Sequence, residues 1–105
     1  MSLNTASLPS GTGNAQIVPA AAGKTIYLRG WAASEDTGTG PARLQIFDAP
    51  GGNLLVPITL VSGASIREFV PPEDAAQGGI ATTTGGLYVV RVAGTSTLVV
   101  YTAVV

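Results

Sequence analysis

Two runs of β-branched and aromatic residues dominate the end of the chain, the first at Leu87–Ala93 and the second at 97–105. The pair Gly94-Thr95 separates the two runs. A Gly-X pair between such runs is a strong signal for a β-hairpin with a two-residue turn. The pattern therefore predicts that residues 87–105 form a closing β-hairpin.

Neither face of this expected hairpin is polar. Because side chains alternate across a strand, one face consists of Tyr88, Val90, Val92, Val99, Tyr101 and Ala103. The opposite face consists of Leu87, Val89, Arg91, Leu98, Val100 and Val104. A two-layer sandwich buries only one face of each sheet. We therefore expect the second face to contact another protein molecule.

Arg91 lies in the middle of the second face, among valine residues. A charged side chain on an apolar strand face rarely stays unpaired. We expect an ion pair between Arg91 and Glu68, Asp48 or a carboxylate of a neighbouring subunit.

The middle of the chain consists of short alternating runs separated by turns rich in glycine and proline. These runs predict strands at 24–33, 42–48, 54–61 and 65–70. Pro57 lies inside the third run, and because proline cannot donate to a strand ladder, that strand belongs at a sheet edge or carries a bulge. One helical turn is expected at 73–77. Short strands without a longer helix predict an all-β fold, a small antiparallel β-sandwich or jelly-roll-like domain over 24–105.

Residues 1–23 are small, polar and rich in glycine, and they cannot build a core of their own. We expect an extended N-terminal arm with one short strand at Ala15–Val18. Two interpretations stay open: a disordered tail, or an arm that becomes ordered against a neighbouring subunit. The second interpretation rests on spaced apolar residues with few other uses, namely Leu3, Leu8, Ile17 and Val18.

The composition narrows the classes of function. Charged residues make up 10% of the 105 residues, against roughly 25% in an average domain, and the net charge of −1 comes without a basic cluster. Nothing therefore indicates nucleic-acid binding. The sequence has no Cys and no His, which excludes disulfides, thiol and imidazole catalysis and ordinary zinc sites. A small domain without such crosslinks gains stability by oligomerisation, so we expect a homo-oligomer.

The apolar runs are far shorter than the ~20 residues needed to span a bilayer. The N-terminus lacks the basic region and long apolar run of a signal peptide. We expect no membrane partner, and synthesis in the cytoplasm.

The acidic pairs Glu35-Asp36 and Glu73-Asp74 are the candidates for acid-base chemistry or calcium binding. Neighbours in sequence usually diverge, and no calcium-loop motif is present, so we interpret both pairs as solvated loop residues. A nucleophilic serine needs a base, and the sequence offers no His for that role. We therefore expect no catalytic, cofactor or metal site, and a protein that is not an enzyme.

Tyr27 and Trp31 share one face of the expected strand at 24–33, opposite the aliphatic face. This aromatic face is interpreted as core or subunit packing, or alternatively as a platform on which sugar rings stack. A sugar site also needs converging polar groups, and these strands are poor in Asn, Asp and Gln.

Three segments together resemble the small virion proteins of tailed bacteriophages. They are AGKTIYLRG at 22–30, GI at 79–80 and GGLYVVRVAGTSTLVVY at 85–101. In that family an N-terminal arm leads into a GK-x-I-x-L-x-G strand, and a GI…GLYV segment leads to a closing β-hairpin. The resemblance covers about residues 22–105 and lies in the β-rich pattern, with no catalytic residues to transfer.

The resemblance implies a capsid decoration (cement) protein. Such a protein is a β-sandwich, often trimeric, that sits on the capsid surface of the virion and ties neighbouring capsomers together. Its implied partners are further copies of itself and the major capsid protein. The alternative is a carbohydrate-binding or receptor-binding β-sandwich module of a phage tail fibre or a secreted protein, with Tyr27 and Trp31 as its ligand platform.

Overall fold

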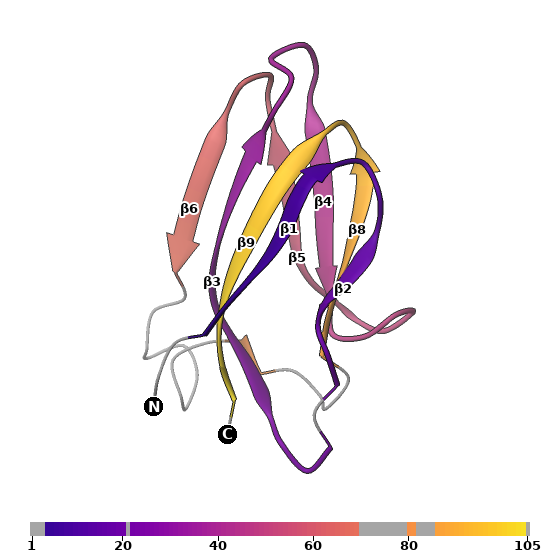
Figure 1. Cartoon of the computed structure of the whole chain (residues 1–105), viewed down its shortest axis with the longest axis vertical. Helices are drawn as coiled ribbons and strands as arrows, with labels where there is room; N and C mark the ends of the chain where they lie inside the picture. Colours follow the sequence, from indigo (N-terminus) through magenta and orange to yellow (C-terminus); the bar gives the residue numbers. More distant parts are fainter. Residues whose placement is uncertain (1–3, 21, 70–79, 82–85, 105) are drawn as a thin grey trace.

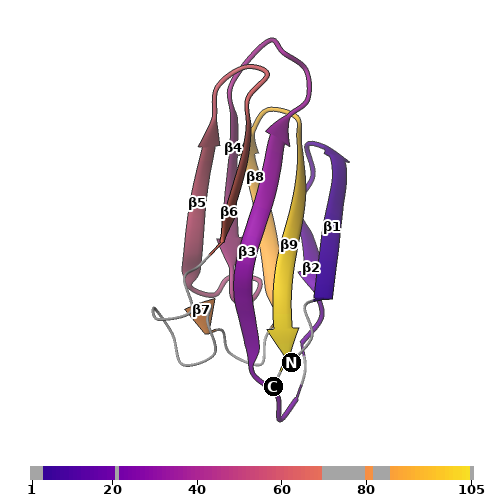
Figure 2. The same cartoon turned by 90° about the vertical axis from the view of Figure 1, so that its left-hand side faces the viewer.

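The computed structural model of the protein describes residues 4–20, 22–69, 80–81 and 86–104, and these residues form two antiparallel β-sheets packed face to face (Figures 1 and 2). The strands are β1 (Asn4–Gly11), β2 (Ala15–Val18), β3 (Ile26–Glu35), β4 (Ala42–Phe47), β5 (Leu54–Leu60), β6 (Ser65–Phe69), β7 (Ile80–Ala81), β8 (Leu87–Ala93) and β9 (Ser96–Val104). The predicted all-β sandwich is confirmed. The helical turn expected at 73–77 lies outside the described residues.

The strand order is that of a jelly roll. Sheet A has the order β1-β9-β3-β6, with the short β7 also paired to β3, and sheet B has the order β2-β8-β4-β5. The pairing is nested: β1 pairs with β9, β2 with β8, β3 with β6 and β4 with β5. The chain thus resembles one long hairpin that is wound across two sheets.

The prediction of a closing hairpin is wrong, because its two strands belong to different sheets. β8 lies in sheet B and β9 lies in sheet A, so the turn at Gly94-Thr95 crosses from one layer to the other. Gly94 has a φ of 78°, and a Cβ there would lie 2.4 Å from the carbonyl oxygen of Pro41. This close approach packs the turn against the start of β4, which directs the chain over the end of the sandwich.

This crossing also reverses the expected roles of the two apolar faces. Since β8 and β9 lie in opposite layers, the face expected to contact another molecule becomes the interior of the sandwich. Leu87, Val89, Leu98 and Val100 have no exposed surface, so they are core residues and not a subunit contact. Arg91 is also buried, and the side chain of Val104 lies outside the described part of the structure.

The first strands are part of the sandwich itself, whereas an arm outside it was expected. β1 adds to the edge of sheet A beside β9, and β2, at its predicted position, adds to the edge of sheet B beside β8. Leu8 is buried in the core, while Ile17 and Val18 pack against it half-buried. These residues therefore contact their own chain. Leu3 lies outside the described residues.

A bulge in β3 places Trp31 in the core. The register with β9 shifts between Leu28 and Gly30, so the strand turns its other side inward beyond this point. Leu28 is fully buried before the shift, and Trp31, 7% exposed, is buried after it. Tyr27, next to Leu28, points outward and is half-buried. The alternative interpretation of Tyr27 and Trp31 as a ligand platform is thus wrong, because the two rings lie on opposite faces of sheet A.

Pro57 lies in β5, at the edge of sheet B, as predicted. The pairing of β5 with β4 also shifts register between Ile46 and Phe47. The shift lies at Leu55, whereas Pro57 is in register with Gln45, so the edge position is the feature that fits a residue that cannot donate to a ladder.

Candidate functional site

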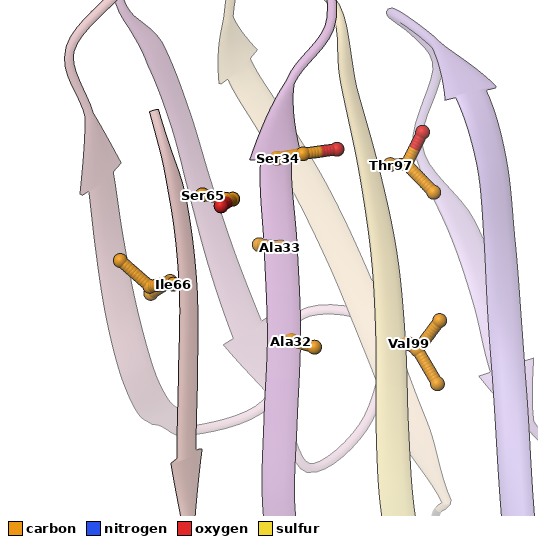
Figure 3. Close-up of a pocket in the computed structure, with 7 residues that line it drawn as sticks. All are labelled: Ala32, Ala33, Ser34, Ser65, Ile66, Thr97 and Val99. Atoms are coloured by element: carbon orange, nitrogen blue, oxygen red, sulfur yellow. The ribbon is translucent and has the colours of Figure 1, made fainter. Parts of the chain in front are cut away.

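The outer surface of sheet A, here called the A face, contains a shallow, open depression of about 300 Å³ (Figure 3). Its floor lies over β3, where the side chains of Ala32 and Ser34 are small, and the larger side chains of Thr97 and Val99 on β9 flank it on one side. The depression is lined by Ala32, Ala33, Ser34, Ser65, Ile66, Thr97 and Val99.

An aromatic cluster lies on the A face at the end of β6. The rings of Phe69 and Tyr101 have centroids 5.2 Å apart with a 30° angle between their planes. The guanidinium carbon of Arg67 lies 5.5 Å from the Phe69 centroid and 5.9 Å from that of Tyr101. A Cβ at Gly30 would lie 2.6 Å from Cδ1 of Phe69, so the glycine lets this ring lie against β3. Phe69 nevertheless keeps 50% of its surface exposed.

Asp36 follows β3 directly, beyond the opposite end of the A face. Its carboxylate accepts hydrogen bonds from the hydroxyls of Ser34 at 2.6 Å, Thr97 at 2.5 Å and Ser10 at 2.7 Å. These hydroxyls, with that of Ser34 contributing most, hold the pKa of Asp36 below its usual value. An exposed carboxylate therefore remains charged at this corner of the sheet.

Glu35, the neighbour of Asp36, points to the inside of the sandwich and is only 5% exposed. Its carboxylate accepts hydrogen bonds from the hydroxyl of Thr37 and from the main-chain N–H groups of Gly63, Thr37 and Gly38, at 2.5–2.9 Å. These bonds, led by the Thr37 hydroxyl, lower the pKa of Glu35 to about 2. The two acids thus diverge as expected, but Glu35 is a buried loop anchor and only Asp36 is solvated. The pair Glu73-Asp74 lies outside the described residues.

Arg91 binds main-chain carbonyls in place of the expected carboxylates. Its Nη2 donates to the carbonyl of Pro9 and makes a longer contact of 3.5 Å with that of Leu8. Its main-chain N–H donates to Oδ1 of Asn14 at 2.8 Å. Burial lowers the pKa of Arg91, and the charge of Asp36 opposes this shift. Arg91 therefore secures the connection between β1 and β2 through contacts within its own chain.

The two carboxylates that were expected to pair with Arg91, those of Asp48 and Glu68, lie elsewhere in the fold. Asp48 accepts the main-chain N–H of Asn53 at 2.7 Å in the turn between β4 and β5. Glu68 is an exposed residue of β6, paired in register with Trp31.

The outer surface of sheet B, here called the B face, is mostly apolar. Phe47 is the register partner of Tyr88 on one side and of Leu54 on the other, which gives a continuous apolar row across three strands. Leu54 is 47% exposed, and Val92 on β8 is 53% exposed. The other outward residues of the four strands are Gln16, Arg43, Gln45, Pro57, Thr59 and Val90. Among these described side chains Arg43 alone is charged.

No group of three or more acidic, histidine or cysteine residues in the described part of the chain is placed to hold a metal ion. The described residues also include no helix that is long and apolar enough to cross a membrane.

The sequence-based reasoning missed the cluster at Phe69 and the role of Asp36 on the same sheet. Alternation in the run 65–70 places Ser65, Arg67 and Phe69 on one face, which is the signal that could have indicated an exposed aromatic residue beside a cation. Comparison with protein-family profiles, with curated proteins and with solved structures found no match for the chain.

Proposed function

We propose that the protein is a structural component of a bacteriophage virion, a decoration protein that binds the major capsid protein on the outside of the head. The observation that carries this proposal is the B face. It combines a continuous apolar row with a single charged side chain among its described outward residues. Exposed apolar surface of this kind is typical of a protein interaction site.

The composition and the resemblance to small virion proteins support the same proposal. A chain with 10% charged residues has few groups to keep an isolated monomer soluble. Burial of the B face against a capsomer would remove Leu54 and Val92 from water, and each square ångström of apolar surface so buried contributes about 25 cal/mol. Decoration of neighbouring capsomers then stabilises the head.

The alternative function, a carbohydrate-binding or receptor-binding module, depended on Tyr27 and Trp31. Trp31 is buried and Tyr27 points to the other side of the sheet, so these two rings offer no common surface to a ligand. We therefore retain the capsid-binding proposal alone.

Co-sedimentation with undecorated phage heads tests the proposal. The wild-type protein is expected to sediment with the heads, and Val92→Glu is expected to weaken binding at least tenfold because it places a charge on the B face. Ser7→Glu is the control, since Ser7 is exposed on β1 and points outward from sheet A, away from the B face. A wild-type protein that stays in the supernatant, or a Val92→Glu protein that binds as tightly as wild type, would contradict the proposal.

A further inference from the structure

The A face carries its opposite charges at two separate corners. Arg67 points outward from β6, where it contacts the rings of Phe69 and Tyr101. Asp36 lies just beyond β3, and its carboxylate is bonded to Thr97 of β9 and to Ser10. Arg29 is a second half-buried cation on the outward side of β3, beyond Gly30 on the side away from Asp36. The other outward residues of the described strands of this surface are uncharged, namely Thr5, Ser7, Tyr27, Gly30, Ala32, Ser34, Ser65, Thr97, Val99 and Tyr101.

Arg67 and Asp36 stand diagonally across the depression. Arg67 is the register partner of Ala32, and Asp36 follows four residues later, which corresponds to about 13 Å along the strand. The two groups also lie on opposite sides of β3, because β6 and β9 are its two neighbours in sheet A. A second copy can be laid face to face on the first and related to it by a rotation of 180° about an axis that runs between the two sheets, parallel to them. If this axis crosses the line from Arg67 to Asp36 at its middle and at right angles, Asp36 of each copy lies over Arg67 of the other.

We infer that the A face binds the A face of a second copy of this chain, related by such a twofold axis. In that pair Arg67 of each copy lies opposite Asp36 of the other, so the twofold axis creates two contacts between opposite charges. The small residues over β3 let the two sheets approach to the spacing of about 10 Å that is usual for stacked sheets. Ala32 and Val99 supply apolar contact near the axis.

The size of the A face sets the strength of this contact. A sheet of four strands, each about seven residues long, covers roughly 440 Å² at the usual strand spacing and rise, or about 900 Å² for both copies. Stable complexes bury about 1,200–2,000 Å². The pair is therefore weak in dilute solution and forms at high concentration, as on a crowded surface. A twofold pair also differs from the trimer that the family resemblance implies.

Charge exchange between two variants tests this inference in solution, without capsids. Sedimentation equilibrium at low salt, from about 10 μM to 1 mM, is expected to show a concentration-dependent dimer for the wild type. Arg67→Asp and Asp36→Arg are each expected to weaken it at least tenfold, because each pair then brings like charges together. An equimolar mixture of the two variants is expected to restore the dimer, since both contacts in the mixed pair are again of opposite charge. Arg43→Asp on the B face makes the same change of charge and is expected to leave the dimer intact.

A wild-type protein that remains monomeric over this range overturns the inference, and so does a mixture that dimerises no better than its components. Circular dichroism of each variant establishes that it is folded, since Asp36→Arg also removes the acceptor of three hydroxyl groups.

A cysteine crosslink gives a second, independent measurement, because the sequence contains no Cys. Ser34→Cys places a thiol near the proposed axis and is expected to oxidise to a disulfide-linked dimer. Thr59→Cys, exposed on the B face, is the control and is expected to stay monomeric. Equal crosslinking of the two variants overturns the inference. The B-face variant Val92→Glu belongs to the capsid experiment, so either proposal can fail while the other holds.

Discussion

The carboxylate of Glu35 accepts a hydrogen bond of 2.8 Å from the main-chain N–H of Gly63, a residue 28 positions further along the chain. The bond joins the loop after β3 to the turn between β5 and β6. Gly38 and Thr37 donate to the same carboxylate, so one buried acid organises two loops at one end of the sandwich.

Replacement of Glu35 by Gln is expected to lower the free energy of unfolding in a way that depends on pH. The pKa of Glu35 is about 2 in the folded protein and near 4.5 when unperturbed, so its carboxylate contributes fully above about pH 4.5. That contribution is lost as the pH falls toward 2. Denaturant unfolding of both proteins between pH 7 and pH 2 is expected to show a difference that is largest at neutral pH and narrows in acid. A difference that is constant with pH would contradict this role of the carboxylate.

Replacement of Gly94 by Ala is expected to destabilise the fold by about 2–4 kcal/mol. The residue has a φ of 78°, and its Cβ would lie against the carbonyl oxygen of Pro41, so backbone strain and a steric clash add together. Gly51→Ala is the matched control, because Gly51 has a φ of 72° with open space around its Cβ position. It is expected to cost only about 1 kcal/mol. Equal effects in chemical denaturation would show that the crossing turn is not closely packed.

Trp31 is expected to behave as a core residue. Trp31 is the single tryptophan, so the tryptophan fluorescence of the protein comes from this residue alone. In the folded protein this fluorescence is expected to resist quenching by iodide, because the side chain is buried. Trp31→Ala is expected to destabilise the fold by about 3–5 kcal/mol, and Trp31→Phe by clearly less. Strong quenching in the folded protein, or a stable Trp31→Ala variant, would instead place the ring on the surface.

Replacement of Arg91 by Met is expected to loosen β1 selectively. Met fills a similar volume but cannot donate to the carbonyls of Pro9 and Leu8. Native-state hydrogen exchange is expected to show faster exchange of the β1 amides, while the amides of β5, at the far edge of sheet B from β8, keep their protection relative to the global unfolding rate. Uniform acceleration across the two strands would mean that Arg91 stabilises the whole sandwich and not this edge.

The alternation of apolar and polar residues along the chain was enough to locate most strands. The runs at 42–48, 54–61 and 65–70 match β4, β5 and β6 to within one residue, and Pro57 correctly indicated an edge. These features are local. The alternation of apolar and polar side chains, and the main-chain N–H that proline lacks, can both be read from a short stretch of sequence.

The partners of the strands were not predictable in the same way. A Gly-X pair fits a tight hairpin and a crossing between layers equally well, and the contact of Gly94 with Pro41 that distinguishes them joins residues far apart in sequence. Both faces of β8 and β9 are apolar, so their pattern did not indicate which face is buried. The bulge before Gly30 reversed the orientation of Trp31, and the residues of the A face come from separate strands.

The position of β9 has a consequence for how the protein folds in the cell. β9 lies between β1 and β3 in the middle of sheet A, yet it is the last of the described strands to be synthesised. Until β9 leaves the ribosome, β1 has no partner strand in sheet A. One edge of β3 also lacks its neighbouring strand until then. Apart from the innermost pair, β4 with β5, the nested pairings of such a jelly roll close over long sequence separations, which makes folding slow. We therefore expect the nascent chain to remain unfolded during translation and to depend on chaperones until its C-terminal strand is available.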